Sequence, residues 1–254
     1  MMGIWIRKLT AFCLLALAGH AAQGAPLSVL AEENLPFSYR QGSTIQGYCT
    51  AVVRASLEAA RLPYQIDIQP WARIYTTTLA KPGTLMFPVA RTAEREDKFR
   101  WIGPLVANRI ALFRKKGRRD VVVHSLDDAR RYRIGVVNMD FREEYLRRKG
   151  FGEAGSQPLV VVNSSELLLP MLQAGRIDLI PLGLAKCAPH GLDCNAMEPV
   201  YVLSELESAL YMVFSRDTSD ALVQQVREGF EQARRNGSVA RIMAPLNRIY
   251  GRGE

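Results

Sequence analysis

The spacing of hydrophobic positions changes repeatedly along residues 27–90, from the alternation of a strand to the 3.6-residue period of a helix. Apolar side chains at Val52, Val53 and Leu57 form one helical stripe, and Pro63 ends it. The predicted strands are residues 27–31, 64–68 and 84–89, and the predicted helices are residues 48–62 and 71–80. Strands that alternate with helices are typical of an α/β fold with a mostly parallel sheet.

The alternation resumes after residue 109 and continues to the last helix. Asn163, with Glu166 three residues on, resembles a capping box for a helix over residues 164–174. Pro170 predicts a kink or an early end of that helix. The further predicted strands are residues 110–113, 133–137, 159–162, 177–181, 201–203 and 209–214, and the further helices are residues 140–149, 164–174, 218–235 and 238–246.

The composition is that of a folded globular protein. The chain has 254 residues, of which 48% are hydrophobic and 23% are charged, so wholesale disorder and collagen-like or coiled-coil repeats are excluded. Its length is roughly twice that of the commonest single domain. Since no internal repeat divides it, we predict two α/β lobes of about 100 residues each.

Residues 1–24 have the pattern of a cleavable signal peptide. Arg7 and Lys8 precede an apolar stretch of 11 residues, 9–19, and the small-residue exit at 22–24 is typical of a cleavage site. This stretch is too short for a spanning helix, which needs about 20 residues. We expect the mature protein to be exported to the periplasm, without insertion into the membrane.

Three cysteines remain after such a cleavage, and an oxidising compartment favours pairing. Cys187 and Cys194 bound a short polar loop that contains Pro189 and Gly191, so we expect a disulfide between these two cysteines. Cys49 is left over at a position where a predicted helix begins to bury its apolar face. We therefore expect a buried free thiol there.

Several motifs suggest chemistry that their context argues against. Residues 150–155 match G-x-G-x-x-G, but they follow a predicted helix instead of a strand, and no helix begins after them. His190 lies between two cysteines without a second ligand cluster, which favours a solvated histidine on a disulfide loop over a metal site. The basic runs lie on separate loops and helix ends without interleaved aromatic residues, which favours solvated surface. We expect no cofactor, no metal and no nucleic-acid partner.

Several sequence features then occur in a characteristic order. They are ENLPFSY at residues 33–39, Gly47 at a helix start, PWAR at 70–73, RTAERE at 91–96, WIGP at 101–104, QAGRID at 173–178 and NGSVARIM at 236–243. In this order they resemble the family 3 periplasmic solute-binding proteins, which serve ABC transporters for polar amino acids. The same fold supplies sensor domains and some enzyme domains.

The resemblance implies a two-lobed fold of the type II periplasmic-binding-protein class, with two mixed sheets flanked by helices and a hinge of two crossing strands. Lobe 1 would comprise residues 25–108 plus 204–254, and lobe 2 residues 109–203. A small carboxylate-bearing, amino-acid-like ligand would bind between the lobes and be passed to the permease of an ABC-type importer. We expect a monomer without catalytic activity.

Arg95 is the first candidate for ligand binding. It follows a predicted strand and a tight turn, so its guanidinium can point across a cleft and bind a carboxylate through two hydrogen bonds. The alternative is a surface arginine paired with Glu94 or Glu96. In the resemblance Trp71 supplies an aromatic wall beneath the ligand, and a core tryptophan is the other interpretation.

The other candidates surround this pair. Arg73 is a second anion contact or a surface residue, and Asp140 either supplies a carboxylate to the cleft or caps a helix. The full set of candidate ligand-binding residues is Arg95, Trp71, Thr92, Ala90, Asn34, Glu33, Arg73, Asp140 and Phe141.

Some positions depart from the family pattern. Asn34 stands where an aromatic residue usually precedes the proline, and Pro88 and Ala90 stand where hydroxyl residues precede the arginine. Gly183 stands where the family carries the aspartate that neutralises a ligand's ammonium group. The sequence therefore predicts capture of a carboxylate. Capture of an α-ammonium group stays open, with Asp140 as the residue that could replace the missing aspartate.

Two other functions remain open. One is an exported enzyme on the same scaffold, of dehydratase or lyase type, with Glu33, Asp140 and Glu143 as candidate acid–base groups. The other is a stand-alone module that senses a ligand for a membrane receptor.

Overall fold

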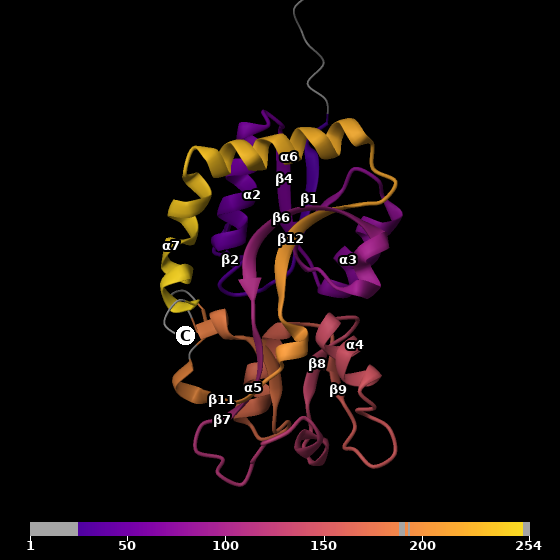
Figure 1. Cartoon of the computed structure of the whole chain (residues 1–254), viewed down its shortest axis with the longest axis vertical. Coiled ribbons are helices and arrows are strands. Elements are labelled where there is room, and N and C mark those ends of the chain that lie inside the picture. The colour runs from indigo at the N-terminus through magenta and orange to yellow at the C-terminus, as the bar shows by residue number, and fades with distance from the viewer. Residues whose placement is uncertain (1–24, 188–190, 193, 251–254) are drawn as a thin grey trace, which may run out of the picture.

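The structure is a computed structural model, and it describes residues 25–187, 191–192 and 194–250. The predicted signal peptide and His190 lie outside these residues. Figure 1 shows two groups of strands, one above the other, each accompanied by helices. We call the part built on the five-stranded sheet lobe 1 and the part built on the second group of strands lobe 2.

Lobe 1 contains a mixed sheet in the strand order β4-β1-β5-β12-β6. β1 pairs in parallel with β4 and β5, whereas β12 pairs antiparallel with β5 and β6. The strands are β1 (Leu27–Ala31), β4 (Tyr64–Ile68), β5 (Leu85–Ala90), β6 (Phe99–Asn108) and β12 (Ser208–Ser215), and a small hairpin is formed by β2 (Tyr39–Gln41) and β3 (Thr44–Gln46).

Helices cover both faces of this sheet. All six residues of β5 are buried, and five of them, all but Pro88, belong to two apolar clusters. Phe87 packs in the cluster that holds Leu57 of α2, and Met86 packs in the cluster that holds Ile74 of α3. Because successive side chains of a strand point to opposite faces, α2 and α3 lie on opposite sides of β5. The helices of lobe 1 are α2 (Tyr48–Ala59), α3 (Trp71–Ala80), α6 (Asp220–Arg235) and α7 (Ser238–Tyr250).

Lobe 2 is built on the antiparallel order β10-β7-β11, beside the parallel pair β8-β9. A single parallel bridge between Ile134 and Leu179 connects the two groups. The elements are β7 (Ile110–Lys115), β8 (Gly135–Val137), α4 (Phe141–Arg148), β9 (Val160–Val162), α5 (Leu168–Gln173), β10 (Ile180–Gly183) and β11 (Met197–Val202).

The chain passes between the lobes twice. β6 ends at Asn108 in one sheet and β7 begins at Ile110 in the other, and the return runs from β11 to β12. Figure 1 shows both connections side by side at the waist of the molecule. We keep residues 25–108 with 204–254, and residues 109–203, as the proposed division into lobes.

Most of the predicted elements are confirmed, and β1, β4 and α3 have the predicted bounds. The helix predicted over residues 164–174 differs. A short 3-10 turn, Ser165–Leu167, precedes α5, and Ser164 instead of Asn163 accepts the capping hydrogen bond from the backbone N–H of Glu166. The expected kink or early end at Pro170 is wrong, because Pro170 lies in the first turn of α5, where a backbone N–H has no helical partner to lose.

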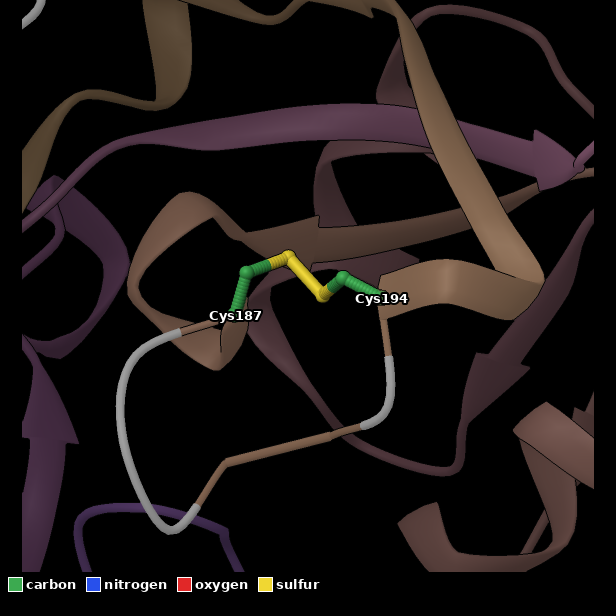
Figure 2. Close-up of a disulfide and its surroundings, with 2 residues drawn as sticks. All are labelled: Cys187 and Cys194. Carbon is green, nitrogen blue, oxygen red and sulfur yellow. A yellow bond between two sulfur atoms is a disulfide. The ribbon is translucent and has the colours of Figure 1, made fainter.

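The cysteine predictions are confirmed. Cys187 and Cys194 form a disulfide with their Cα atoms 5.5 Å apart, and Figure 2 shows it closing the loop that leads into β11. Cys49 is buried in α2 and has no partner among the described cysteines. Burial raises the pKa of the Cys49 thiol, so this residue is an inert part of the core.

Candidate functional site

A cavity of about 20 Å³ lies between the two lobes, with room for about one water molecule. Both lobes supply its walls. Those from lobe 1 are Glu32, Asn34, Phe37, Trp71, Pro88, Ala90, Arg95, Asn108 and Leu210, and those from lobe 2 are Asp140, Phe141, Arg142, Gly183 and Lys186. The lining is unusually rich in charge for an interior, so the pairing of each charge decides what the cavity can bind.

Arg95 is the most deeply buried charge in this cavity. It lies in a 3-10 turn, Ala93–Lys98, directly after β5, and only 1% of its surface is exposed. Nη2 donates to the backbone carbonyl of Met139 at 3.1 Å and to Oε1 of Glu144 at 3.2 Å, both in lobe 2. Among the described residues, Nε and Nη1 have no hydrogen-bond partner. Arg95 therefore keeps N–H donors that a ligand anion can satisfy.

Three aromatic rings surround the Arg95 guanidinium. Its Cζ atom lies 5.0 Å from the ring centroid of Trp71, 5.3 Å from that of Tyr75 and 5.9 Å from that of Phe141. Such contacts are attractive for a guanidinium, and these rings exclude water from around it. The side chain is thus held in one place before any ligand arrives.

Met139 joins the two lobes through its backbone. Its carbonyl accepts hydrogen bonds from Nε1 of Trp71 at 2.8 Å and from Arg95, and its N–H donates to Oε2 of Glu143 at 2.7 Å. The residue adopts a φ of 61°, which is uncommon outside glycine. This left-handed conformation belongs to the turn that ends in α4.

Asp140 and Arg142 form a buried ion pair at the start of α4. Asp140 is the N-cap, since its Oδ1 accepts from the backbone N–H of Arg142 at 2.9 Å. The Arg142 side chain adds bonds of 2.5 Å from Nε to Oδ1 and 3.0 Å from Nη2 to Oδ2. Burial alone would raise the pKa of Asp140, but the charge and hydrogen bonds of Arg142 outweigh it and lower the pKa. Both interpretations of Asp140 therefore hold, because it caps the helix and also faces the cavity.

A second chain of polar groups crosses the cavity from Lys186 to Glu32. Nζ of Lys186 donates to Oδ1 of Asn34, and Nδ2 of Asn34 donates to Oε1 of Glu32 at 2.8 Å. Lys186 comes from the 3-10 turn Leu184–Cys187 of lobe 2, next to the disulfide, whereas Glu32 follows β1 of lobe 1. Lys186 and Glu32 are both buried.

The surroundings bring both of these groups to titrate near neutral pH. Burial, with the charge of Asp140, raises the pKa of Glu32 to about 7. Burial, with the charge of Arg142, lowers the pKa of Lys186 to about 7. In each case the opposite charge of the other group works against the shift, which shows that the two form an electrostatic unit.

Two larger hollows continue from this cavity along the seam between the lobes. One of about 200 Å³ shares Glu32 and Trp71 with it. Another of about 300 Å³ shares Lys186, and its wall is mostly apolar, formed by Leu35, Leu168, Leu169, Pro170, Ile180, Leu182 and Leu192. Lys186 therefore stands between the small charged cavity and an apolar groove.

Other contacts hold the lobes together around the cavity. Oγ of Ser165 donates to the backbone carbonyl of Glu33 at 2.7 Å, and Arg148 of α4 pairs with Glu94. These contacts, with those of Trp71, Arg95 and Lys186, join the lobes on several sides.

The structure gathers six of the nine candidate ligand-binding residues at this cavity: Arg95, Trp71, Ala90, Asn34, Asp140 and Phe141. The surface interpretation of Arg95 is wrong, because the side chain is buried and pairs with Glu144. Trp71 lies in a core cluster, as one of its two interpretations required, and it also lines the cavity. Its role beneath a ligand stays a prediction.

The other three candidates lie elsewhere. Glu33 lines the two neighbouring hollows, and its carboxylate accepts from the backbone N–H of Arg40 at 3.1 Å. Thr92 lines a separate hollow beside Arg148 and Glu205. Arg73 is exposed on α3 and belongs to the wall of none of these hollows in the described part of the chain.

Glu32, Arg142 and Lys186 were missed from the sequence. Glu32 directly follows a predicted strand, which is a place where functional side chains gather, and this signal was available. Arg142 lies two residues after Asp140, in the first turn of α4, so its closeness to a candidate residue was a second signal. Lys186 carries no local signal, because it reaches the cavity only through the packing of the two lobes.

The comparison with protein-family models decides the family. Residues 27–245 match the model of the bacterial extracellular solute-binding proteins, family 3. The chain belongs to this family. The resemblance that the sequence motifs indicated is therefore confirmed.

Several solved structures are similar in fold to this family 3 protein over most of its length. The sensor domain of a histidine kinase with similarity to periplasmic binding proteins is 18% identical, with a TM-score of 0.72, over 85% of this chain and 94% of that domain. The arginine-, lysine-, histidine-binding protein ArtJ of Geobacillus stearothermophilus is also 18% identical, with a TM-score of 0.70, over 85% and 92%. The GluR0 ligand-binding core of Nostoc punctiforme, in complex with L-glutamate, is 15% identical, with a TM-score of 0.71, over 86% and 97%.

These likenesses confirm the two-lobed fold of the family 3 protein. None of the curated proteins matches the chain. In the described part of the chain, no helix is long and apolar enough to cross a membrane, and no cluster of histidine, cysteine or acidic residues could hold a metal ion.

Proposed function

We propose that this protein binds a small carboxylate ligand of amino-acid size between its lobes, and that Arg95 holds the carboxylate. The observation that carries the proposal is the buried Arg95 guanidinium, whose Nε and Nη1 have no partner among the described residues. A buried cation with unsatisfied donors is costly unless an anion completes it. The aromatic rings around Arg95 supply the apolar wall that such a site needs.

Binding would follow a hinge movement. The two strand connections at the waist allow the lobes to separate, and the hydrogen bonds from Trp71 and Arg95 to the Met139 carbonyl would re-form on closure. The site thus works by binding and closure, without a chemical step.

We further propose that the protein is exported and delivers its ligand to the permease of an ABC-type importer, as a monomer. The signal-peptide pattern of residues 1–24 and the disulfide between Cys187 and Cys194 support export to an oxidising compartment. Membership of the extracellular solute-binding family supports the transport role.

A thermal-shift screen of amino acids, dicarboxylates, polyamines and small peptides tests the binding role. A ligand present at 100 times its dissociation constant is expected to stabilise the protein by about 2.7 kcal/mol. Arg95→Met should abolish the shift for every carboxylate, whereas Arg73→Met, an exposed arginine in the same lobe, should leave it unchanged. Stabilisation only by ligands without an anionic group would contradict the proposal.

A stand-alone sensor is the second candidate function, favoured by the similarity to a histidine-kinase sensor domain. It would use the same closure, read by a receptor instead of a permease. An exported enzyme would instead turn a ligand over, and the cavity-lining Glu32 would be its first acid–base candidate. Incubation of the protein with each stabilising ligand, followed by product analysis, separates catalysis from binding.

A further inference from the structure

The polar groups of the cavity are paired unequally. Asp140 accepts three hydrogen bonds from Arg142, so its charge is matched within lobe 2. Oε1 of Glu32 accepts from the amide of Asn34, which in turn accepts from Lys186, so the Glu32 carboxylate is connected to an amine of the chain itself through one neutral side chain. By contrast, Arg95 retains N–H groups without a partner among the described residues. The cavity offers donors for an anion, and it already contains an amine, Lys186, on which the charges of Glu32 and Asp140 act.

We propose that Lys186 takes, from within the chain, the place that a ligand's amino group would need, so that the cleft selects a carboxylate without an amino group over the corresponding amino acid. This inference rests on the proposed function and names its ligand class. It goes beyond that function because it assigns Lys186 as the residue that determines specificity.

Three features of Lys186 support the assignment. The side chain is buried although lysine is almost never fully buried, and its Nζ bridges to the other lobe at Asn34. Four charged groups act electrostatically on the Lys186 amine: Glu32, Glu33, Asp140 and Arg142. Two of them, Glu32 and Asp140, are the acidic residues of the cavity wall. Whether charged or neutral, the amine donates a hydrogen bond, so it occupies its place in either state.

A ligand with an ammonium group would meet an unfavourable environment here. Arg95, Arg142 and Lys186 would repel it. Both carboxylate oxygens of Asp140 are bonded to Arg142, and Oε1 of Glu32 already accepts from the amide of Asn34. The same ligand without the amino group leaves every existing pair in place and adds only an acceptor for Nε and Nη1 of Arg95, which have no partner among the described residues. Selectivity therefore arises from a repulsive element as well as an attractive one.

Titration calorimetry with matched ligand pairs tests the proposal. The pairs are L-glutamate with glutarate, L-leucine with 4-methylpentanoate and L-phenylalanine with 3-phenylpropanoate, and the last two suit the apolar groove next to Lys186. The wild type should bind the member without the amino group at least tenfold more tightly. Lys186→Met should reduce or reverse that preference by at least tenfold. Lys115→Met is the control, because Lys115 donates to the backbone carbonyl of Gln173 on an exposed face.

Lys186→Gln provides a second variant in case Lys186→Met does not fold, since an amide keeps a donor for Asn34 and removes the charge. The contrary result is that the wild type binds each amino acid as tightly as the matched ligand without the amino group, while Arg95→Met loses binding of both. That result would overturn the role of Lys186 and leave the proposed function standing. Absence of binding for all six probes would overturn both.

Discussion

Nε1 of Trp71 in lobe 1 donates a 2.8 Å hydrogen bond to the backbone carbonyl of Met139 in lobe 2. The aromatic wall of the cavity is therefore also a latch between the lobes. The same carbonyl accepts from Arg95, so the groups proposed to hold the ligand are joined to the turn that closes over it. In the proposed function, closure and ligand recognition would therefore depend on the same few atoms.

Trp71→Phe should favour the open form of the protein. The change keeps an aromatic ring and removes the hydrogen bond across the lobes, which is worth about 0.5–1.5 kcal/mol. The balance between open and closed forms should move by roughly three- to tenfold, which small-angle X-ray scattering would record as a larger radius of gyration. Trp101→Phe is the matched control, because Trp101 donates to the carbonyl of Glu96 within lobe 1. Equal radii for both variants would contradict the latch.

Met139→Ile should destabilise the protein by about 1–3 kcal/mol, because a β-branched residue is strained at the φ of 61° found there. Met139→Gly should cost much less, since glycine adopts this conformation freely. Urea denaturation of the two variants measures the difference. Similar losses in both would show that the Met139 side chain, which is partly exposed, matters more than its backbone.

The pair of Glu32 and Lys186 should produce a minimum in stability near pH 7. The pKa of Glu32 is raised to about 7 in the folded protein, so between pH 5 and 7 the folded protein binds more protons at Glu32 than the unfolded chain does. The free energy of unfolding therefore falls by about 2 kcal/mol as the pH rises from 5 to 7. Above pH 7 the unfolded chain keeps the Lys186 proton that the folded protein loses, so stability rises again.

Denaturation curves between pH 5 and 8.5 measure this minimum. The double variant Glu32→Gln/Lys186→Met should flatten both slopes. The control is the exposed ion pair of Lys149 and Glu205, changed to methionine and glutamine, which should leave the slopes in place. If the stability minimum persists in Glu32→Gln/Lys186→Met, groups other than Glu32 and Lys186 cause it.

Reduction of the disulfide should weaken both stability and ligand binding. The Cys187–Cys194 bond closes a loop with a sequence separation of 7, and a loop of this size contributes about 2–3 kcal/mol in the chain-entropy model. Lys186 precedes Cys187 in the same turn, so a looser turn should also loosen the amine in the cavity. Urea denaturation with and without reductant measures the loss of stability, and titration calorimetry measures the loss of ligand affinity. An unchanged affinity after reduction would show that the disulfide does not position Lys186.

The sequence predicted those parts of the site that depend on local structure. Trp71 is the first residue of α3, and Arg95 lies in the short turn after β5. Both boundaries can be recognised from short-range sequence patterns. No strand was predicted over β6, which contains Pro104. β6 is the edge strand of the sheet formed by the described strands, where a proline is tolerated.

Lys186 could not have been predicted in the same way. It is separated by 152 positions from its partner Asn34, and its turn has no hydrophobic period that would fix the direction of the side chain. Its place in the cavity results from the packing of lobe 2 against lobe 1. The proposed determinant of specificity therefore depends on long-range contacts, while the proposed carboxylate-binding residues are positioned by local structure.

Calorimetry on Arg95→Met tests the central claim most directly. The ligand is whichever of the six matched probes binds the wild type most tightly, and Arg73→Met is measured beside it. The account predicts at least a hundredfold loss of affinity for Arg95→Met, with the fold retained by circular dichroism, and no change for Arg73→Met. A folded Arg95→Met protein that binds the same carboxylate as tightly as the wild type would contradict it.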